Sequence, residues 1–440
     1  MIADRRQFLS ATGSAFAAFA AAGCAARAAG GLAALPAADA YGALVPDPAA
    51  ILDLPPGFSY RVLSTLGDAM TDGGTVPDRA DGMGCFDIGN GELALVRNHE
   101  LNAIADSGGA NGPAYDTVAR SLVPLAGGTT TLVIDAATLA VKRQYRSLAG
   151  TIRNCAGGVT PWGSWLSCEE NVSRADGQIN RDHGYVFEVP ANAERQVIPV
   201  ALTAMGRFNH EAAVVDPASG IVYLTEDRPD SLLYRFIPAI PGQLAAGGQL
   251  QALAAEGVAD SRNWENRQIA VGQAVACRWI DLDNVEAPED DLRQRGAAQG
   301  ATLFARGEGI WMGEGEFYFT CTSGGPGRFG QIFRLRPASN ANGADMLDLF
   351  FESASGDDFT YGDNLTIAPD GHLIVCEDRS GNQVNYIRGV TTAGGVYPFA
   401  RLRVETEPAG VCFSPDGATL FVNLMEPTRT LAITGPWNWG

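Results

Sequence analysis

The feature that most constrains the fold is a β-hairpin that recurs along the chain. A turn glycine is followed each time by a short apolar strand, and six such units can be aligned on the glycines Gly91, Gly163, Gly220, Gly315, Gly371 and Gly417. The turns before three of these strands, as in Pro369-Asp-Gly371, combine proline, which presets one dihedral, with glycine, which supplies a positive one. Repeated hairpins of this kind predict an all-β fold.

The spacing of the hairpins favours a six-bladed β-propeller with loop insertions. The turn glycines are 46 residues apart at the closest and 95 at the widest, whereas a four-stranded blade needs roughly 40–50 residues. Two β-sandwiches would explain the turns, but not the repeated strand ends described below. We expect one propeller domain over residues 51–440 with an insertion around 238–291, preceded by an extended lead-in over 28–50.

Residues 1–27 have the pattern of a twin-arginine signal peptide. Arg5 and Arg6 precede an alanine-rich, weakly apolar stretch that is too short and too alanine-rich to span a membrane well. We therefore expect export of the folded chain by the twin-arginine translocase, to the periplasm or the medium. The segment Ala21-Ala-Gly-Cys24 also resembles a lipoprotein cleavage box, so that a lipid anchor at Cys24, tethering the protein to a membrane, is an alternative.

The chain is acidic, and its carboxylates gather at the strand ends. With 50 acidic and 31 basic residues the net charge is −19, which disfavours nucleic acid as a partner. In a hairpin, the start of the first strand and the end of the second lie at the same edge. The acidic residues at these ends are therefore expected around one mouth of the central channel: Glu100, Glu169, Glu170, Glu211, Glu226, Asp227, Glu308, Asp363, Glu377 and Asp378.

So many like charges in one place favour bound cations, since they repel one another strongly otherwise. Oxygen ligands in number suit calcium, and a thiolate among them suggests a softer metal such as iron or zinc. The predicted ligands are Cys168, Glu169, Glu211, Glu308, Glu100, Glu226, Asp363 and Glu377. For a single acidic pair, such as the one in Glu226-Asp-Arg228, an ordinary salt bridge is the alternative.

Arg306 is the candidate substrate-binding and catalytic residue. It precedes Glu308 by two positions, so both side chains point to the same side of a strand. A guanidinium fork beside cations suits phosphate, although a structural ion pair is the alternative. Arg228 and Arg379 are further substrate-binding candidates. His99 and His210 each precede a glutamate and are interpreted as packed behind the site, which disfavours three-histidine zinc chemistry.

On the basis of these residues, the chain resembles the PhoX family of bacterial alkaline phosphatases. The matching words include the twin-arginine leader, Asn98-His-Glu100, Asn154-Cys-Ala-Gly-Gly158 running on to Cys168-Glu-Glu-Asn171, Arg207-Phe-Asn-His-Glu211, Arg306-Gly-Glu-Gly309 and Cys376-Glu-Asp-Arg379. The resemblance implies a six-bladed propeller with Fe(III) and Ca²⁺ at the channel mouth, and hydrolysis of phosphomonoesters. It implies that Cys168 ligates iron, that Glu211 and Glu308 bind metal, and that Arg306 contacts phosphate.

Two departures leave other functions open. The chain is shorter than the phosphatases that define the family, and Lys142 is its only lysine. A calcium-dependent lactonase or esterase would need acidic ligands but neither a thiolate nor a phosphate-binding arginine. A non-catalytic propeller would use its metals only for stability.

Overall fold

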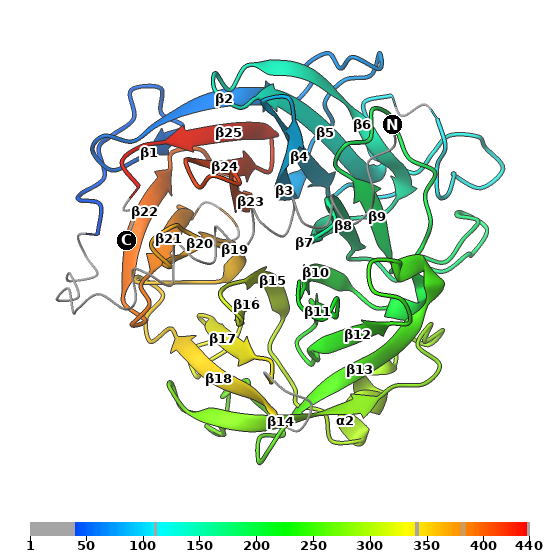
Figure 1. The fold of residues 1–440 in the computed structure, drawn as a ribbon, viewed down its shortest axis with the longest axis vertical. Coiled ribbons are helices and arrows are strands. Elements are labelled where there is room, and N and C mark those ends of the chain that lie inside the picture. Colours follow the sequence, from blue (N-terminus) through cyan, green and yellow to red (C-terminus); the bar gives the residue numbers. More distant parts are fainter. Residues whose placement is uncertain (1–39, 110–111, 339–342, 380, 382, 438–440) are drawn as a thin grey trace, which may run out of the picture.

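The computed structural model describes residues 40–109, 112–338, 343–379, 381 and 383–437. The predicted signal peptide, Cys24 and most of the predicted lead-in lie outside these residues. Within them, no helix is both long and apolar enough to cross a membrane. The strands are arranged around a central axis like the blades of a propeller (Figure 1), and helix is almost absent, as the hairpin pattern predicts.

The described residues form five hydrogen-bonded sheets. The first two contain β3 (Ala80–Gly89), β4 (Glu92–His99), β5 (Gly127–Asp135) and β6 (Val141–Thr151), and β7 (Asn154–Val159), β8 (Ser164–Glu169) and β9 (Val186–Pro190). The third runs in the order β10 (His210–Val215), β11 (Val222–Glu226), β12 (Tyr234–Pro238), β13 (Gly248–Ala255), β14 (Ala274–Asp281), β18 (Asp345–Glu352), β17 (Gln331–Arg336), β16 (Phe317–Cys321) and β15 (Gly307–Met312).

The last two sheets contain the ends of the chain. One is β19 (Gly362–Ile367), β20 (Leu373–Glu377), β21 (Tyr386–Val390), β22 (Val396–Leu402) and β1 (Leu52–Asp53); the other is β23 (Pro408–Phe413), β24 (Thr419–Leu424), β25 (Arg429–Thr434) and β2 (Ser59–Thr65). The helical segments are η2 (Thr203–Met205), η3 (Leu244–Ala246) and α2 (Leu292–Ala298).

Pairing between the two ends of the chain closes the circle. β2 pairs with β25, and β1 pairs with β22, so the N-terminal strands complete sheets that the C-terminal strands begin. Aromatic side chains reinforce this closure. Phe58 lies edge-on to Trp437 with ring centroids 4.8 Å apart, and Tyr41, from the predicted lead-in, contacts both rings. Such pairs stabilise by about 0.5–1.5 kcal/mol beyond the area they bury.

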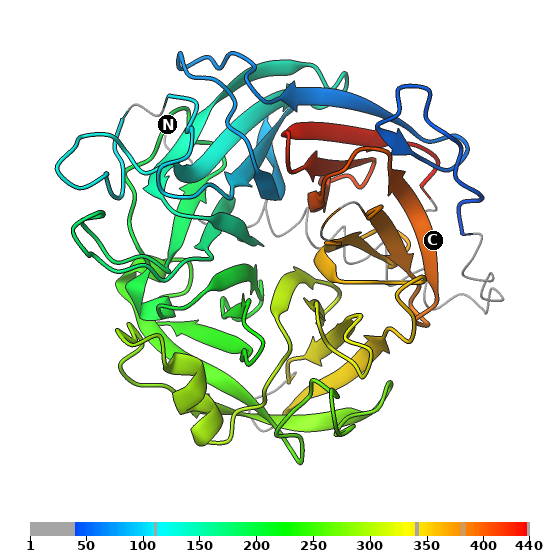
Figure 2. The same cartoon turned by 180° about the vertical axis from the view of Figure 1, so that it is seen from behind.

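Six innermost strands surround the axis, although the sheets number five. β3, β7, β10, β15, β19 and β23 each contact the next in a closed circle, which both views show around the centre (Figures 1 and 2). Six separate sheets are not found among the described residues, because β14 pairs with β18 and joins two groups of strands. The range 238–291, predicted as an insertion, contains β13 and β14 of this joined sheet.

Each innermost strand carries a β-bulge near its start. In β3, for example, Ala80 pairs with His99 and Met83 with Arg97, so two residues of the inner strand, Asp81 and Gly82, oppose the single residue Asn98 of its partner. The same shift follows the first or second residue of β7, β10, β15, β19 and β23. A bulge redirects the side chains beside it, and here it recurs around the channel at one depth.

Candidate active site

A cavity of about 190 Å³ lies where the six innermost strands begin. We call it the mouth cavity; it is lined by Arg79, Asp81, Glu100, Arg153, Cys155, Glu170, Glu211, Asp227, Arg306, Glu308, Asp363, Asp378, Glu407 and Met425. Nine carboxylates therefore face three arginines in a small space. Seven of the ten acidic residues predicted at one opening belong to this lining.

The lining follows the repeat of the fold. The second residue of each innermost strand is Asp81, Cys155, Glu211, Glu308, Asp363 or Ala409, and all but the alanine line the mouth cavity. The inner strands also approach one another closely near the axis, which explains the glycines beside these residues. At Gly309, directly after Glu308, a Cβ would lie only 2.7 Å from the carbonyl oxygen of Asp363. One backbone position, repeated around the channel, thus supplies five ligand-type side chains.

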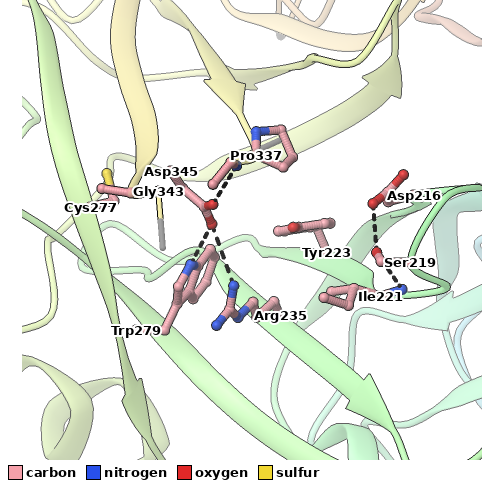
Figure 3. Close-up of a pocket in the computed structure, with 12 residues that line it drawn as sticks. Asp216, Ser219, Ile221, Tyr223, Arg235, Cys277, Trp279, Pro337, Gly343 and Asp345 are labelled. Atoms are coloured by element: carbon pink, nitrogen blue, oxygen red, sulfur yellow. Dashed lines mark hydrogen bonds and ion pairs between the residues drawn. The ribbon is translucent and has the colours of Figure 1, made fainter. Parts of the chain in front are cut away.

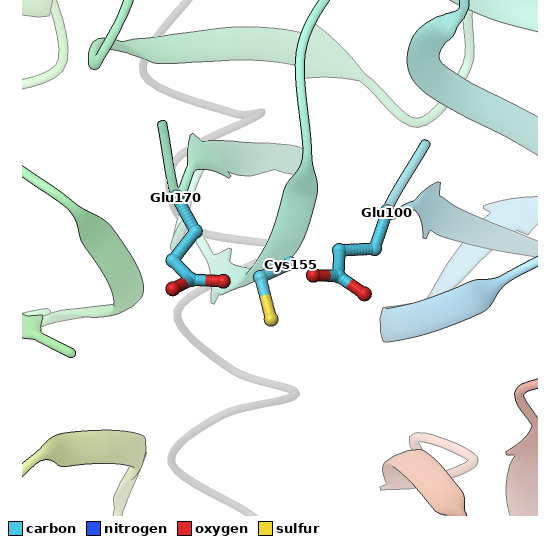
Figure 4. Close-up of side chains that lie close together, drawn as sticks. All are labelled: Glu100, Cys155 and Glu170. Atoms are coloured by element: carbon cyan, nitrogen blue, oxygen red, sulfur yellow. The ribbon is translucent and has the colours of Figure 1, made fainter. Parts of the chain in front are cut away.

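Two groups of these side chains have the geometry of metal sites. Glu100, Cys155 and Glu170 place their ligand atoms within 4.8 Å of one another, and Figure 4 shows the three side chains converging. Glu211, Glu308 and Asp363 do the same. The first group offers a thiol with two carboxylates, and the second offers carboxylates alone, which are the donor sets expected for a softer and a harder cation.

The electrostatics of the mouth cavity also favour bound cations. Burial, and then the neighbouring Glu308 and Asp363, raise the pKa of Glu211 well above its usual value, and burial raises the pKa of Glu170 to about 8. Both carboxylate oxygens of Glu211 are buried without a hydrogen-bond partner among the described residues. A buried, unpartnered carboxylate is costly unless a cation or a proton joins it, so these residues fit bound metal ions.

Arg306 lies at the mouth cavity beside the second group, as predicted. Its Nε and Nη2 donate to the two carboxylate oxygens of Asp227 at 2.7 and 2.9 Å, and Nη2 also donates to Glu308 at 2.8 Å. Its backbone is left-handed, with φ of 56°, a conformation that costs a non-glycine residue about 1–2 kcal/mol. Such strain is common where a side chain must be aimed at a site.

Cys168, the predicted iron ligand, does not lie at the mouth cavity. Cys168 on β8 is fully buried in an apolar cluster with Val186 and Phe208, and it does not line the mouth cavity. The thiol in the cavity is that of Cys155, whose pKa is raised well above its usual value, first by burial and then by Asp81. Cys155 belongs to the sequence motif Asn154-Cys-Ala-Gly-Gly158. The resemblance to the family therefore included this cysteine, although iron ligation was assigned to Cys168.

Three of the predicted glutamate ligands also lie away from the mouth cavity. Each is the last residue of its strand and has buried protein partners: Glu169 accepts from His183 at 2.6 Å, Glu226 from Tyr234 at 2.7 Å and Glu377 from Arg388 at 2.9 Å. None of them lines the mouth cavity. The residue that follows each of them does, namely Glu170, Asp227 or Asp378. The predicted ligands Glu100, Glu211, Glu308 and Asp363 do line it.

Two predicted arginines lie outside the mouth cavity, and two unpredicted ones line it. Arg228 donates to Asn209 at 3.1 Å, and Arg379 donates to the carbonyl oxygen of Gly356. Arg79 and Arg153 take their place in the lining, with Asp81 and Glu407 as further residues that the sequence reasoning missed. These four residues begin, or come directly before, the innermost strands, which is the signal that could have identified them.

The histidines pack behind the site, as interpreted from the sequence. His99 bonds the Asp78 carbonyl and Thr130 through its two ring nitrogens, at 2.9 and 2.8 Å. His210 stacks on Phe208 with ring centroids 3.6 Å apart. Neither lines the mouth cavity, and the described lining of that cavity contains no histidine.

A larger cavity of about 430 Å³ lies away from the axis, between β12, β14 and β18 (Figure 3). Its charged groups already have partners: Asp345 accepts from Trp279 at 2.7 Å and from Arg235 at 3.4 Å, and Arg235 stacks on Trp279. Among the described residues, its lining contains no group of candidate metal ligands. Both such groups found in the described part of the chain line the smaller mouth cavity.

Comparison with known proteins agrees with this geometry. The family model described as alkaline phosphatase PhoX matches residues 39–428. Among solved structures, PhoX of Pseudomonas fluorescens in complex with vanadate, a transition-state analogue, superposes with a TM-score of 0.68 at 19% identity, covering 91% of this chain and 97% of that one.

Two further structures are similar at lower scores. A gluconolactonase of Xanthomonas campestris has 14% identity and a TM-score of 0.40, covering 90% of this chain and 98% of its own. A luciferin-regenerating enzyme has 10% identity and a TM-score of 0.44, covering 86% and 96%. A search of curated protein sequences finds no match. Because the family model spans most of the sequence, the chain belongs to the PhoX family of alkaline phosphatases, which are phosphoric ester hydrolases.

Proposed function

We propose that this chain is an exported phosphatase that hydrolyses phosphomonoesters with iron and calcium ions held in the mouth cavity. The observation that carries the proposal is Arg306 beside the group Glu211, Glu308 and Asp363, with a thiol-containing group in the same cavity. A lactonase of the kind weighed above would need neither the thiol nor the arginine, so both features favour the phosphatase.

The identity of the ions rests on donor chemistry and charge. Nine carboxylates against three arginines leave a formal charge of −6 in the lining of the mouth cavity when all of these groups are ionised. Hard carboxylate oxygens suit Ca²⁺, and the Cys155 thiolate with Glu100 and Glu170 suits a softer ion, for which we propose Fe(III). When bound, such ions would neutralise phosphoryl oxygens and lower the pKa of water.

The chain's own residues contribute binding and orientation. Asp227 and Glu308 fix the Arg306 guanidinium through Nε and Nη2, and no hydrogen bond involving Nη1 is found among the described residues. Nη1 can therefore donate to a phosphoryl oxygen, and such a charge-assisted bond strengthens as negative charge develops there. Burial lowers the pKa of Arg306, but Glu308 and Asp227 outweigh it and raise the pKa above its usual value, so the guanidinium stays charged.

We also propose that the architecture counts as six blades. The six innermost strands, each with the same bulge, support this count, and the β14–β18 pairing would then join two neighbouring blades at their outer edges. The twin-arginine pattern in residues 1–27 supports export to the periplasm or the medium, with a lipid anchor at Cys24 as the tethered alternative.

The test of the proposed function uses the metal-loaded protein. We expect it to hydrolyse a chromogenic phosphomonoester and to be inhibited by inorganic phosphate. An Arg306→Ala variant should retain its metals but lose activity and phosphate inhibition, because Nη1 is removed while the carboxylates remain. Full activity and unchanged phosphate inhibition in Arg306→Ala would mean that Arg306 forms only a structural ion pair and does not bind substrate.

A further inference from the structure

Arg153 repeats the geometry of Arg306 elsewhere in the mouth cavity. Each arginine directly precedes an innermost strand, β7 or β15, and each has a left-handed backbone, with φ of 49° and 56°. The Arg153 carbonyl accepts from Glu170 N at 2.8 Å, and the Arg306 carbonyl accepts from Thr322 N at 3.0 Å, so the two backbones occupy equivalent places.

The side chains are also used in the same way. Arg153 donates through Nε to Glu100 at 2.9 Å and through Nη2 to Glu100 and Glu170. As at Arg306, the Nη1 atom of Arg153 forms no hydrogen bond with any described residue. The two side chains are comparably exposed, 36% for Arg153 and 32% for Arg306. Carboxylates thus hold both guanidinium groups, and the Nη1 atom of each remains able to donate to a ligand.

Each arginine accompanies one candidate metal group. Arg153 binds two members of the group Glu100, Cys155 and Glu170, whereas Arg306 binds Glu308 of the other group. Both groups line one cavity of about 190 Å³, well below the roughly 300–1,000 Å³ of pockets that bury drug-sized ligands. A cavity this small suits a phosphoryl group, with the rest of the ester outside.

We propose that Arg153 is a second phosphoryl-contacting arginine, which donates through Nη1 to the same phosphoryl group that Arg306 holds. This inference rests on the proposed phosphatase function and deepens it. It means that the substrate's phosphoryl group is held by arginines of two different innermost strands, β7 and β15. Lysine carries its donors on a single nitrogen, so it cannot reproduce the separate donor directions of Nε, Nη2 and Nη1 in the Arg153 guanidinium.

The test is the Arg153→Lys variant of the metal-loaded protein, probed with inorganic phosphate. Phosphate carries no second group, so its affinity reports contact with the phosphoryl position alone. The variant keeps a positive charge beside Glu100 and Glu170, and we expect it to retain its metals. Loss of one charge-assisted hydrogen bond should raise the phosphate inhibition constant about tenfold, and Arg306→Lys should show a similar loss.

Arg143→Lys is the matched control. Arg143 has a comparably exposed side chain, 35%, but lies outside the mouth cavity, bonded to Glu92 at 3.3 Å. We expect its phosphate inhibition constant to remain within twofold of the wild-type value. Isothermal titration of phosphate into the metal-loaded proteins gives the same comparison without turnover.

The outcomes separate the two levels of the proposal. If the wild-type protein neither binds phosphate nor hydrolyses phosphomonoesters, the proposed function fails and this inference fails with it. If the wild type does both and Arg153→Lys keeps wild-type phosphate affinity, only this inference is overturned. Loss of metal from Arg153→Lys also overturns it, because Arg153 would then act by positioning the metal ligands.

Discussion

Replacing Glu211 by glutamine should change stability in opposite directions with and without bound metal. Glu308 and Asp363 have ligand atoms no more than 4.8 Å from that of Glu211. At an effective dielectric constant of 20, two unit charges at that distance repel by about 3 kcal/mol. Without metal, protonation relieves most of this repulsion. We therefore expect Glu211→Gln to stabilise the metal-free protein by about 1–3 kcal/mol, because glutamine is neutral without the free-energy cost of protonating a buried carboxyl group.

With metal bound, the same substitution removes a ligand. Breaking a buried charge pair costs about 3–5 kcal/mol, so the metal-loaded variant should be less stable than the metal-loaded wild type and should hold less metal. Chemical denaturation followed by tryptophan fluorescence, with and without a chelator, measures both effects. The control is Glu226→Gln, because Glu226 is equally buried but bonded to Tyr234 and paired with Arg293. It should be destabilised in both conditions.

A change of the same sign for Glu211→Gln in both conditions would refute the reasoning. A stabilised metal-loaded variant would mean that Glu211 binds no cation. A destabilised metal-free variant would mean that the carboxylate has protein partners in solution that outweigh its repulsion from Glu308 and Asp363.

Two further predictions concern the first metal group, which contains Cys155, and the buried His183. Cys155→Ser should lose iron and its absorbance, whereas Cys168→Ala should keep iron and lose about 1–2 kcal/mol of stability through lost apolar contacts; the reverse pattern would restore the assignment made from the sequence. Burial lowers the pKa of His183, but Glu169 and Asp116 outweigh it and raise the pKa above the usual 6.5. The stabilisation that charged His183 contributes is then fully present below about pH 6.5 and is lost as the pH rises through the folded-state pKa. Denaturation of His183→Gln at several pH values should therefore show a loss of unfolding free energy that shrinks as the pH rises. A constant or growing loss would contradict the raised pKa of His183.

Much of the fold follows from the sequence because its signal is local and repeated. Each turn glycine and the apolar strand after it predict a hairpin, and the recurrence of hairpins predicts a propeller. The joining of two strand groups through β14 and β18 could not be predicted, because it depends on an outer strand in the range 238–291 that pairs across to the next group. The sequence there has no hairpin of the repeated type.

The site was predicted as a set of strand ends but not residue by residue. In each of the pairs Glu169–Glu170, Glu226–Asp227 and Glu377–Asp378, the first residue ends a strand, and only the second lines the mouth cavity. Sequence alone does not fix the last residue of a strand, and an error of one position exchanges the two sides.

The cysteines were misassigned for a related reason. Cys155 is the second residue of an innermost strand, where the bulge sets the side-chain direction, and a bulge has no simple sequence signature. Cys168 lies directly before two glutamates, so its sequence neighbours are acidic. Its neighbours in space are apolar.

The metal content of the purified protein tests the central claim most directly. Elemental analysis of the wild type, Cys155→Ser and Glu211→Gln should find iron and calcium in the wild type, less iron in the first variant and less calcium in the second. Phosphatase activity should fall with each loss. A wild-type protein that hydrolyses phosphomonoesters without bound iron or calcium, or variants that keep the full wild-type complement of both metals, would contradict the account.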